Sequence, residues 1–221
     1  MPADRRATRP AAGGGRWVEV APERLPRWLA GFAQRHGEPT ASMLGEAVCL
    51  SAPDGTVAEL FPPPGAPAPA SPADLVVQAQ RPRRLGLLLA RQGAVAVGIA
   101  EGARLTESKV ETSYVQGRTA AGGWSQQRFA RRRVNQGRAA ATSAADAVAR
   151  LLLPQAEHLA ALVTGGDRRA VAAVLADRRL AGLAGLRTER FLTVGEPRRA
   201  VLEQAVAAAR TVRIRLEEPG P

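Results

Sequence analysis

Two short apolar runs in the middle of the chain constrain its fold more than any other feature. The segments LGLLLA (85–90) and AVAVGIA (94–100) are separated only by Arg91, Gln92 and Gly93. Apolar runs of this length, broken by a short turn, predict two neighbouring strands. This part of the chain is therefore expected to belong to a β-sheet.

Strands and helices alternate along the chain from about residue 73. Alternating side chains predict a strand at 108–116, and a long helix is expected from about Gln126 to Leu153. The later elements are a strand ending in a glycine turn (158–166), a helix capped by Asp167 (167–177), a strand (190–194), a helix opened by Pro197 (197–209) and a strand (211–216). This order is typical of an α/β (α+β) fold, a mixed β-sheet flanked by helices.

A small N-terminal α/β extension precedes this pattern. It comprises a strand at 16–20, a helix at 22–37 and a hairpin at 47–61 that turns at Pro53-Asp54-Gly55. The following Pro/Ala-rich stretch lacks the large apolar side chains that a folded element needs. The predicted domains are a disordered tail (1–15), a small N-terminal unit (16–61), a linker (62–72), a main domain (73–216) and a tail (217–221).

The net charge of +11 indicates a polyanionic partner, and nucleic acid is the first candidate. Lys109 is the only lysine and alanine is abundant, so part of this charge can reflect a GC-rich coding sequence. The arginines nevertheless cluster along the chain. Clustering favours a functional basic surface over a purely compositional one.

Cysteine and histidine are too few for a clustered metal site. The chain has one cysteine, Cys49, and its two histidines, His36 and His158, are far apart in sequence. We therefore expect neither a metal nor a cofactor. A lone cysteine in an apolar stretch is typical of a buried side chain in the reducing cytoplasm, and no apolar run is long enough to cross a membrane.

The segment GRTAAGGWSQQRFARRR (117–133) carries the strongest functional signal. It joins a flexible glycine pair, a tryptophan, two glutamines and a basic helix start. Taken singly, these features have ordinary explanations as a turn, a packing anchor and a solvated helix face. Together they suit a phosphate chain beside a small reactive group, because arginine binds phosphate through paired hydrogen bonds and glycine allows close backbone approach.

Other catalytic patterns fit the sequence less well. The strands at 85–100 carry no carboxylates inside them for a two-metal nuclease, and Ser125 has neither a Gly-x-Ser-x-Gly motif nor a nearby histidine. The TGGD segment at 164–167 is weakly similar to a phosphate-binding glycine turn at a helix start, but it lacks a P-loop lysine.

The 117–133 segment resembles the catalytic loop of the eukaryotic and archaeal class I release factors. In that family a Gly-Gly-Gln tip is followed by Ser-x-x-Arg-Phe-x-Arg. Gly122 and Gly123 match the tip glycines, whereas Trp124 stands where the family has glutamine. The matching residues of the helix start are Ser125, Arg128, Phe129 and Arg131.

A related branch matches the tip better. The spacing Gly123-Trp124-Ser125-Gln126 is similar to the Gly-x-x-Gln tip of the release-factor-like peptidyl-tRNA hydrolases of ribosome quality control. The chain resembles the actinobacterial members of this branch most. The resemblance is strong over about 85–135 and extends by element order to 216.

The resemblance implies the fold of the class I release factor catalytic (middle) domain over 73–216, and hydrolysis of the ester between nascent peptide and tRNA. Gln126 would be the catalytic amide, with Gln127 as the alternative, on a loop that the ribosomal peptidyl-transferase centre receives. The loop residues are Gly122, Gly123, Trp124 and Ser125, and the implied RNA-binding residues are Arg118, Arg128, Arg131, Arg132, Arg133 and Arg138. The implied partners are the large ribosomal subunit and peptidyl-tRNA, with the protein acting as a cytoplasmic monomer without membrane contact.

Three functions stay open from the sequence. The first is a codon-independent peptidyl-tRNA hydrolase that rescues stalled ribosomes, since the short 16–61 unit carries no codon-reading motif. The second is an endonuclease of the same branch that cuts near the tRNA 3′ end. The third is a ribosome- or RNA-binding module without catalysis. The products of the reaction distinguish them, because only the endonuclease shortens the tRNA.

Overall fold

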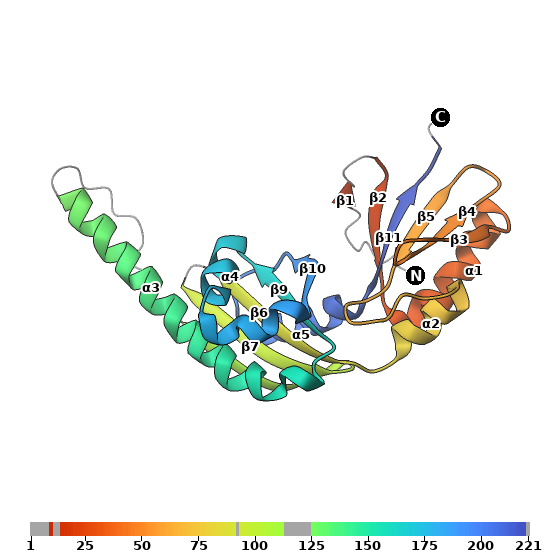
Figure 1. The fold of residues 1–221 in the computed structure, drawn as a ribbon. Coiled ribbons are helices and arrows are strands. Elements are labelled where there is room, and N and C mark those ends of the chain that lie inside the picture. Colours follow the sequence, from red (N-terminus) through yellow and green to blue (C-terminus); the bar gives the residue numbers. More distant parts are fainter. Residues whose placement is uncertain (1–8, 11–13, 92, 113–124, 220–221) are drawn as a thin grey trace. The chain divides into compact units, whose positions relative to one another are not determined.

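The chain forms two compact units, and each is described by itself. The computed structural model describes residues 9–10, 14–91, 93–112 and 125–219, with the backbone alone for Arg9 and for residues 125–138. The first unit comprises residues 1–82 and 207–221, and the second comprises residues 83–206. Both are mixtures of strands and helices, as Figure 1 shows, so the predicted α/β class is confirmed.

The first unit contains an antiparallel sheet in the order β1-β2-β11-β5-β4-β3. Its strands are β1 (Arg9–Pro10), β2 (Arg16–Val20), β3 (Thr40–Leu44), β4 (Ala47–Ser51), β5 (Val57–Phe61) and β11 (Val212–Glu217), and its helices are η1 (Pro22–Arg24), α1 (Leu25–His36) and α2 (Pro72–Gln80). The helices cover one face of the sheet, where Phe32 and Leu75 pack against Leu60 and Ile214. All four side chains are fully buried.

Several predictions for the first unit are confirmed. Strand β2 has the predicted bounds, and β4 and β5 form the predicted hairpin. The N–H of Gly55 donates to the carbonyl of Ala52 at 3.0 Å, and the φ of +86° at this glycine lies in the left-handed region that the turn requires. The Asp-Gly pair therefore makes the tight turn that its sequence indicates.

The two units divide the chain differently from the predicted domains. The linker was predicted to end at residue 72 and the main domain to begin at 73, yet α2 begins at Pro72 and belongs to the first unit. Ser71 caps this helix by accepting the N–H of Asp74, and its residues Leu75 and Ala79 are buried in the first core. Strand β11 also departs from the predicted main domain, because it pairs with β2 and β5.

The second unit contains a mixed sheet in the order β10-β9-β6-β7-β8. Its elements are β6 (Arg84–Arg91), β7 (Ala94–Glu101), β8 (Arg104–Thr112), α3 (Ser125–Leu152), η2 (Leu153–His158), β9 (Ala161–Gly166), α4 (Arg168–Leu175), η3 (Arg178–Leu186), β10 (Arg187–Leu192) and α5 (Arg199–Arg210), whose last residues belong to the first unit. Strands β6, β9 and β10 run parallel, while β7 pairs antiparallel with β6 and β8. The order of strands and helices is the one that the sequence predicts.

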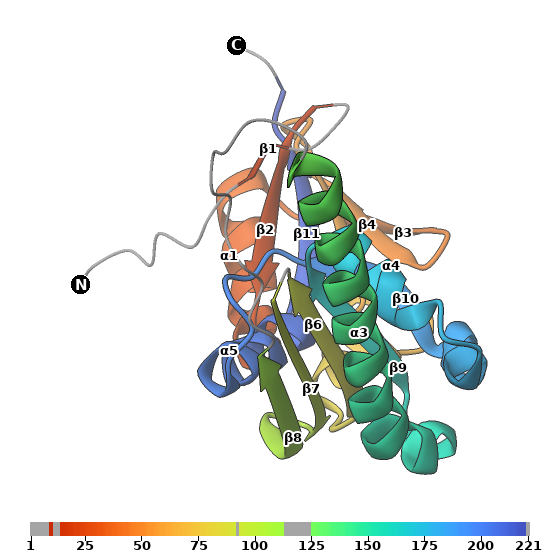
Figure 2. The ribbon, with the colours of Figure 1, turned by 90° about the vertical axis from the view of Figure 1, so that its left-hand side faces the viewer.

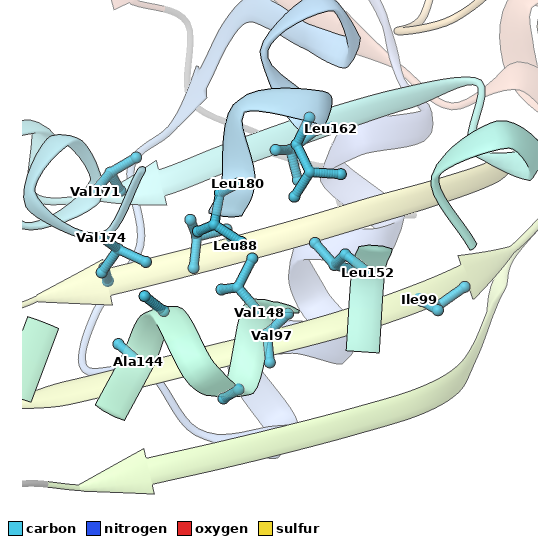
Figure 3. Packing of buried hydrophobic residues seen from close by; sticks show 14 of the residues in the cluster. Leu88, Val97, Ile99, Ala144, Val148, Leu152, Leu162, Val171, Val174 and Leu180 are labelled. Atoms are coloured by element: carbon cyan, nitrogen blue, oxygen red, sulfur yellow. The ribbon is translucent and has the colours of Figure 1, made fainter. Parts of the chain in front are cut away.

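Helix α3 lies along one face of this sheet (Figure 2). Its residues Ala144, Val148 and Leu152 recur every four positions, so they share one side of the helix and are buried. They pack with apolar side chains of β6, β7, β9, α4 and η3, as Figure 3 shows; the labelled members are Leu88, Val97, Ile99, Leu162, Val171, Val174 and Leu180. This cluster is the core of the second unit.

Helix α5 covers the other face of the second sheet. Neighbouring residues of a strand point to opposite faces, so Gly98 faces away from the side that Val97 and Ile99 share with α3. Leu202 of α5 approaches Gly98. The sheet is thus enclosed between helices, which explains why β6 and β7 are nearly continuous apolar runs.

Candidate functional site

The predicted catalytic segment joins β8 to α3. Arg118, Gly122, Gly123 and Trp124 lie outside the described residues, between Thr112 and the start of the helix. Ser125 is the first residue of α3, so Gln126 and Gln127 belong to its first turn. The predicted RNA-binding residues Arg128, Arg131, Arg132, Arg133 and Arg138 are all on the same helix, for which this stretch is described by its backbone.

The helix carries this segment beyond the sheet. Figure 1 shows the first half of α3 running past the strands of the second sheet. Among residues 139–152, whose side chains are described, Ala144 is the first that is buried. From Ser125 to Ala144 the helix rises about 28 Å, at 1.5 Å per residue. The glutamines are therefore presented at the end of a long helical arm.

A polar contact ties the anchored half of α3 to the strand that precedes the loop. Ser143 donates its hydroxyl to Glu111 at 2.7 Å, and Arg150 lies 3.6 Å from the same carboxylate. Glu111 is the penultimate residue of β8. This contact joins the two elements from which the loop begins and ends, so it limits how the arm can tilt against the sheet.

A second polar contact ties α3 to η3. Arg179 lies 2.7 Å from Asp146 of α3 and 2.6 Å from Asp177. The hydrogen bond from the Arg179 side chain is the largest cause that lowers the pKa of Asp177 to about 2, and the backbone N–H of Arg179 adds to it. The same carboxylates raise the pKa of Arg179 above its ordinary value. The pair of Asp177 and Arg179 therefore stays charged at neutral pH.

The loop leaves the sheet at the edge where the parallel strands end. Thr112 is opposite Ala94, and Ala94 is opposite Arg91, the last residue of β6. The carboxyl ends of β6 and β9 lie side by side, because Ala90 is opposite Gly166. This edge of an open sheet is the usual place for binding sites in α/β proteins.

The TGGD turn at this edge has a packing role. A side chain at Gly165 would place its Cβ 2.8 Å from the carbonyl oxygen of Leu192, and one at Gly166 would collide with Ala90. Asp167 accepts the N–H groups of Arg169 at 2.7 Å and Ala170 at 3.0 Å, as a predicted N-cap should. Both hydrogen bonds lower the pKa of Asp167, and the bond from Ala170 contributes most. Two of the N–H groups at this helix start are thus already taken by a carboxylate, which argues against the weak phosphate-turn interpretation.

Neither a metal cluster nor a membrane helix is found in the described ranges. No three or more His, Cys, Asp or Glu side chains within them come together in a way that could hold a metal ion. None of the helices there has the length and apolar character needed to cross a membrane.

The contacts that support α3 have no signal in the local sequence. Glu111 and Ser143 are 32 positions apart, and Asp146 and Arg179 are farther still, so no local motif connects them. Asp177 and Arg179 are near neighbours, but their spacing resembles that of many exposed charge pairs. Among the polar residues at this end of the sheet, only Asp167 had a recognisable sequence signal. Its place directly before a helix predicts that it caps α4.

Comparison with known proteins gives one family match and several distant structural similarities, of which two are named below. The model of the family "Actinobacteria/chloroflexi VLRF1 release factor" matches residues 83–215, more than half of the chain. The crystal structure of an archaeal translation termination factor, aRF1, has a TM-score of 0.41 and 17% identity, covering 72% of this chain and 48% of its own. A structure described as "Archaeal protein" has a TM-score of 0.39 and 16% identity, covering 88% and 65%.

The chain spans about half of the first of these structures and just under two thirds of the second. A comparison with curated proteins gave no match.

Proposed function

With residues 83–215 matching its model, the chain belongs to the Actinobacteria/chloroflexi VLRF1 release factor family, and we propose that it hydrolyses peptidyl-tRNA. It acts on stalled ribosomes or free large subunits, in the cytoplasm and as a monomer. It releases the nascent peptide without a codon-reading step. The substrate bond is the ester between the peptide and the tRNA.

One observation carries the proposal: the Gly-x-x-Gln segment ends at the start of a long helix within the matched residues. Gln126 lies in the first turn of α3. The first four N–H groups of any α-helix lack partners inside the helix, and the helix dipole makes this end positive. Such an end favours a negative charge, and an oxyanion develops on the ester carbonyl during hydrolysis.

The chemistry requires positioning more than acid–base catalysis. The ester is already activated, so a water molecule held in line with its carbonyl and a stabilised oxyanion are enough. The Gln126 side-chain amide orients the water or the oxyanion without changing its protonation state. Gln127 is the alternative for this role, since a shift of one residue in the loop exchanges the two amides.

The basic residues around the tip bind RNA. We assign this role to Arg118, Arg128, Arg131, Arg132, Arg133 and Arg138, because guanidinium groups bind phosphates through paired hydrogen bonds. Gly122 and Gly123 allow the tip to approach RNA closely, and Trp124 and Ser125 complete the loop. The arm of α3 gives this tip the reach to enter a narrow site on the ribosome.

The test mixes pure protein with large subunits that carry peptidyl-tRNA labelled on both the peptide and the tRNA. Free peptide with intact tRNA supports the hydrolase. Peptide attached to a short 3′ fragment of the tRNA, with the tRNA shortened, overturns it in favour of the endonuclease. Retained binding without any product overturns it in favour of a binding module.

A further inference from the structure

Three exposed arginines gather at the edge of the second sheet from which the loop departs. Arg91 is the last residue of β6, and Arg168 and Arg169 are the first two of α4, which follows β9. All three are exposed. The N–H of Asp167 donates to the carbonyl of Ala90 at 2.7 Å, so the ends of the two strands are fixed beside each other.

Neutral groups hold two of these arginines in place. Arg91 donates from Nη1 to the carbonyl oxygen of Val194 at 3.1 Å. The guanidinium carbon of Arg168 lies 4.3 Å from the centre of the Phe191 ring. A carbonyl or an aromatic ring orients a guanidinium group without cancelling its charge.

Asp167 is the carboxylate close to this cluster. Both Arg169 and Arg91 act on it electrostatically, and the pKa of Asp167 is lowered chiefly by the N–H groups of Ala170 and Arg169 that it accepts. No ion pair joins Asp167 to the three arginines in the part of the chain that the structure describes. Three guanidinium groups and one carboxylate leave a local charge of about +2 at neutral pH.

Four other arginines in the described part of the second unit pair with carboxylates. Arg150 pairs with Glu111 at 3.6 Å, Arg179 with Asp146 at 2.7 Å, and Arg199 with Glu203 at 3.2 Å. Arg198 pairs with Glu196. The difference matters because a paired arginine must give up its carboxylate before it can bind another anion.

The cluster lies on the same edge of the sheet as the exit of the loop. Strand β7 alone separates β6 from β8 in the strand order, so Arg91 lies about 10 Å across the sheet from the strand that enters the loop, at ~4.8 Å per strand. Arg168 and Arg169 of α4, which follows β9, extend the cluster away from β8 in the strand order. The cluster therefore lies near the base of the loop, and an RNA molecule that reaches from it to Gln126 must extend about 27 Å along α3.

We infer that Arg91, Arg168 and Arg169 form a second RNA-binding site, which takes the phosphate backbone of the RNA that the loop contacts. The inference rests on the proposed function only in naming RNA as the polyanion; the basic cluster itself follows from the structure. Arginine suits phosphate because its planar fork matches two phosphate oxygens. The orientation given by Val194 and Phe191 reduces the conformational entropy that binding costs.

The test compares two double variants in binding to pure tRNA and to large subunits without tRNA. Arg91→Gln/Arg168→Gln removes the two oriented guanidinium groups. Arg198→Gln/Arg199→Gln is the matched control, which removes the same charge from carboxylate-paired positions. Affinity is measured at several salt concentrations, and thermal melting verifies the fold.

The Arg91/Arg168 variant should bind more weakly than the control and lose about 0.7–0.9 units of salt slope for each phosphate contact removed. If the slope falls for tRNA, the site binds tRNA phosphates; if it falls for large subunits, the site binds phosphates of ribosomal RNA. Should the Arg168 change weaken the fold, Arg169→Gln tests the site alone and should lose about one contact. An unchanged slope with both RNAs in a folded variant overturns the site.

The binding experiment does not require catalysis, so its result can be distinguished from the result of the peptide-release experiment that tests the proposed function. A reduced slope in the variant, with no peptide release by the wild-type protein, supports the site and overturns the hydrolase. Normal release by the wild type, with an unchanged slope in the variants, overturns the site alone.

Discussion

The two halves of α3 have different compositions. Residues 139–152 read AAATSAADAVARLL, and their small and apolar side chains pack on the second sheet. Residues 125–138 read SQQRFARRRVNQGR, which is polar and basic throughout except for isolated positions. One half therefore anchors the helix on the sheet, while the other half carries the residues for which we propose RNA binding. Changes in each half should affect different measurements.

The largest expected effect is on stability in the anchored half. Leu152 is fully buried in the second core, so Leu152→Ala should lower the free energy of unfolding by about 2–5 kcal/mol, through lost burial and the cavity left behind. Denaturant unfolding measures it. The control is Ala139→Ser at an exposed position of the same half, which should change stability little. Equal losses in the two variants would contradict the packing of Leu152 in the second core.

The next effect is on catalysis in the arm. Gln126→Ala should slow peptide release by about 10²–10³, the usual loss when an oriented oxyanion or water contact is removed. Its melting temperature and its ribosome binding should stay near those of the wild type. Single-turnover release is the measurement, with Gln127→Ala as the matched variant. Full release by Gln126→Ala together with an inactive Gln127→Ala would assign the other amide, and full release by the double variant would remove the amide mechanism.

A smaller effect is expected where α3 meets β8. Ser143→Ala removes the hydrogen bond to Glu111 and should cost about 1 kcal/mol of stability. Glu111→Gln should cost less, because an amide oxygen still accepts the hydroxyl while only the attraction to exposed Arg150 is lost. Denaturant unfolding of both variants checks the order. A larger loss for Glu111→Gln would mean that the ion pair, and not the hydrogen bond, supports the helix.

The smallest expected effect is on the stability of the protein at acidic pH. The pKa of Asp177 in the folded protein is about 2, below its ordinary value near 3.8, so its contribution is present above about pH 4 and disappears as the pH falls toward 2. Arg179→Gln removes the largest cause of this shift, the hydrogen bond from the guanidinium group, and leaves the backbone N–H in place. Melting temperatures measured from pH 5 to pH 2 should start higher for the wild type and converge with those of the variant. A constant difference over this range would exclude Asp177 as the source.

Local chemistry made much of the second unit predictable. The apolar runs at 85–90 and 94–100 became β6 and β7, and Asp167 became an N-cap, because each signal depends on neighbouring residues alone. The start of α3 was likewise predicted within one residue. The catalytic roles of Gln126 and Gln127 stay predictions from the motif.

Features that depend on distant contacts were not predictable. The alternation of Val212, Ile214 and Leu216 indicates a strand, but no local signal says that its partners are β2 and β5. Helix α2 follows a stretch rich in proline and alanine, and burial of Leu75 in the first core stabilises it more than helix propensity does. The cluster of Arg91 with α4 depends in the same way on the pairing of β6 with β9, whose partners, such as Ala90 and Gly166, are 76 positions apart.

The position of β11 between β2 and β5 has a consequence for the order of folding. The whole second unit, residues 83–206, separates β5 from β11 in the sequence. During synthesis the first sheet therefore cannot be completed until the second unit has left the ribosome. Until then, β2 and β5 both lack the strand that pairs with them. The second unit has all of its own strands by then, so it can fold first. The second unit, which carries the proposed catalytic segment, can thus be folded before β2 and β5 find their shared partner.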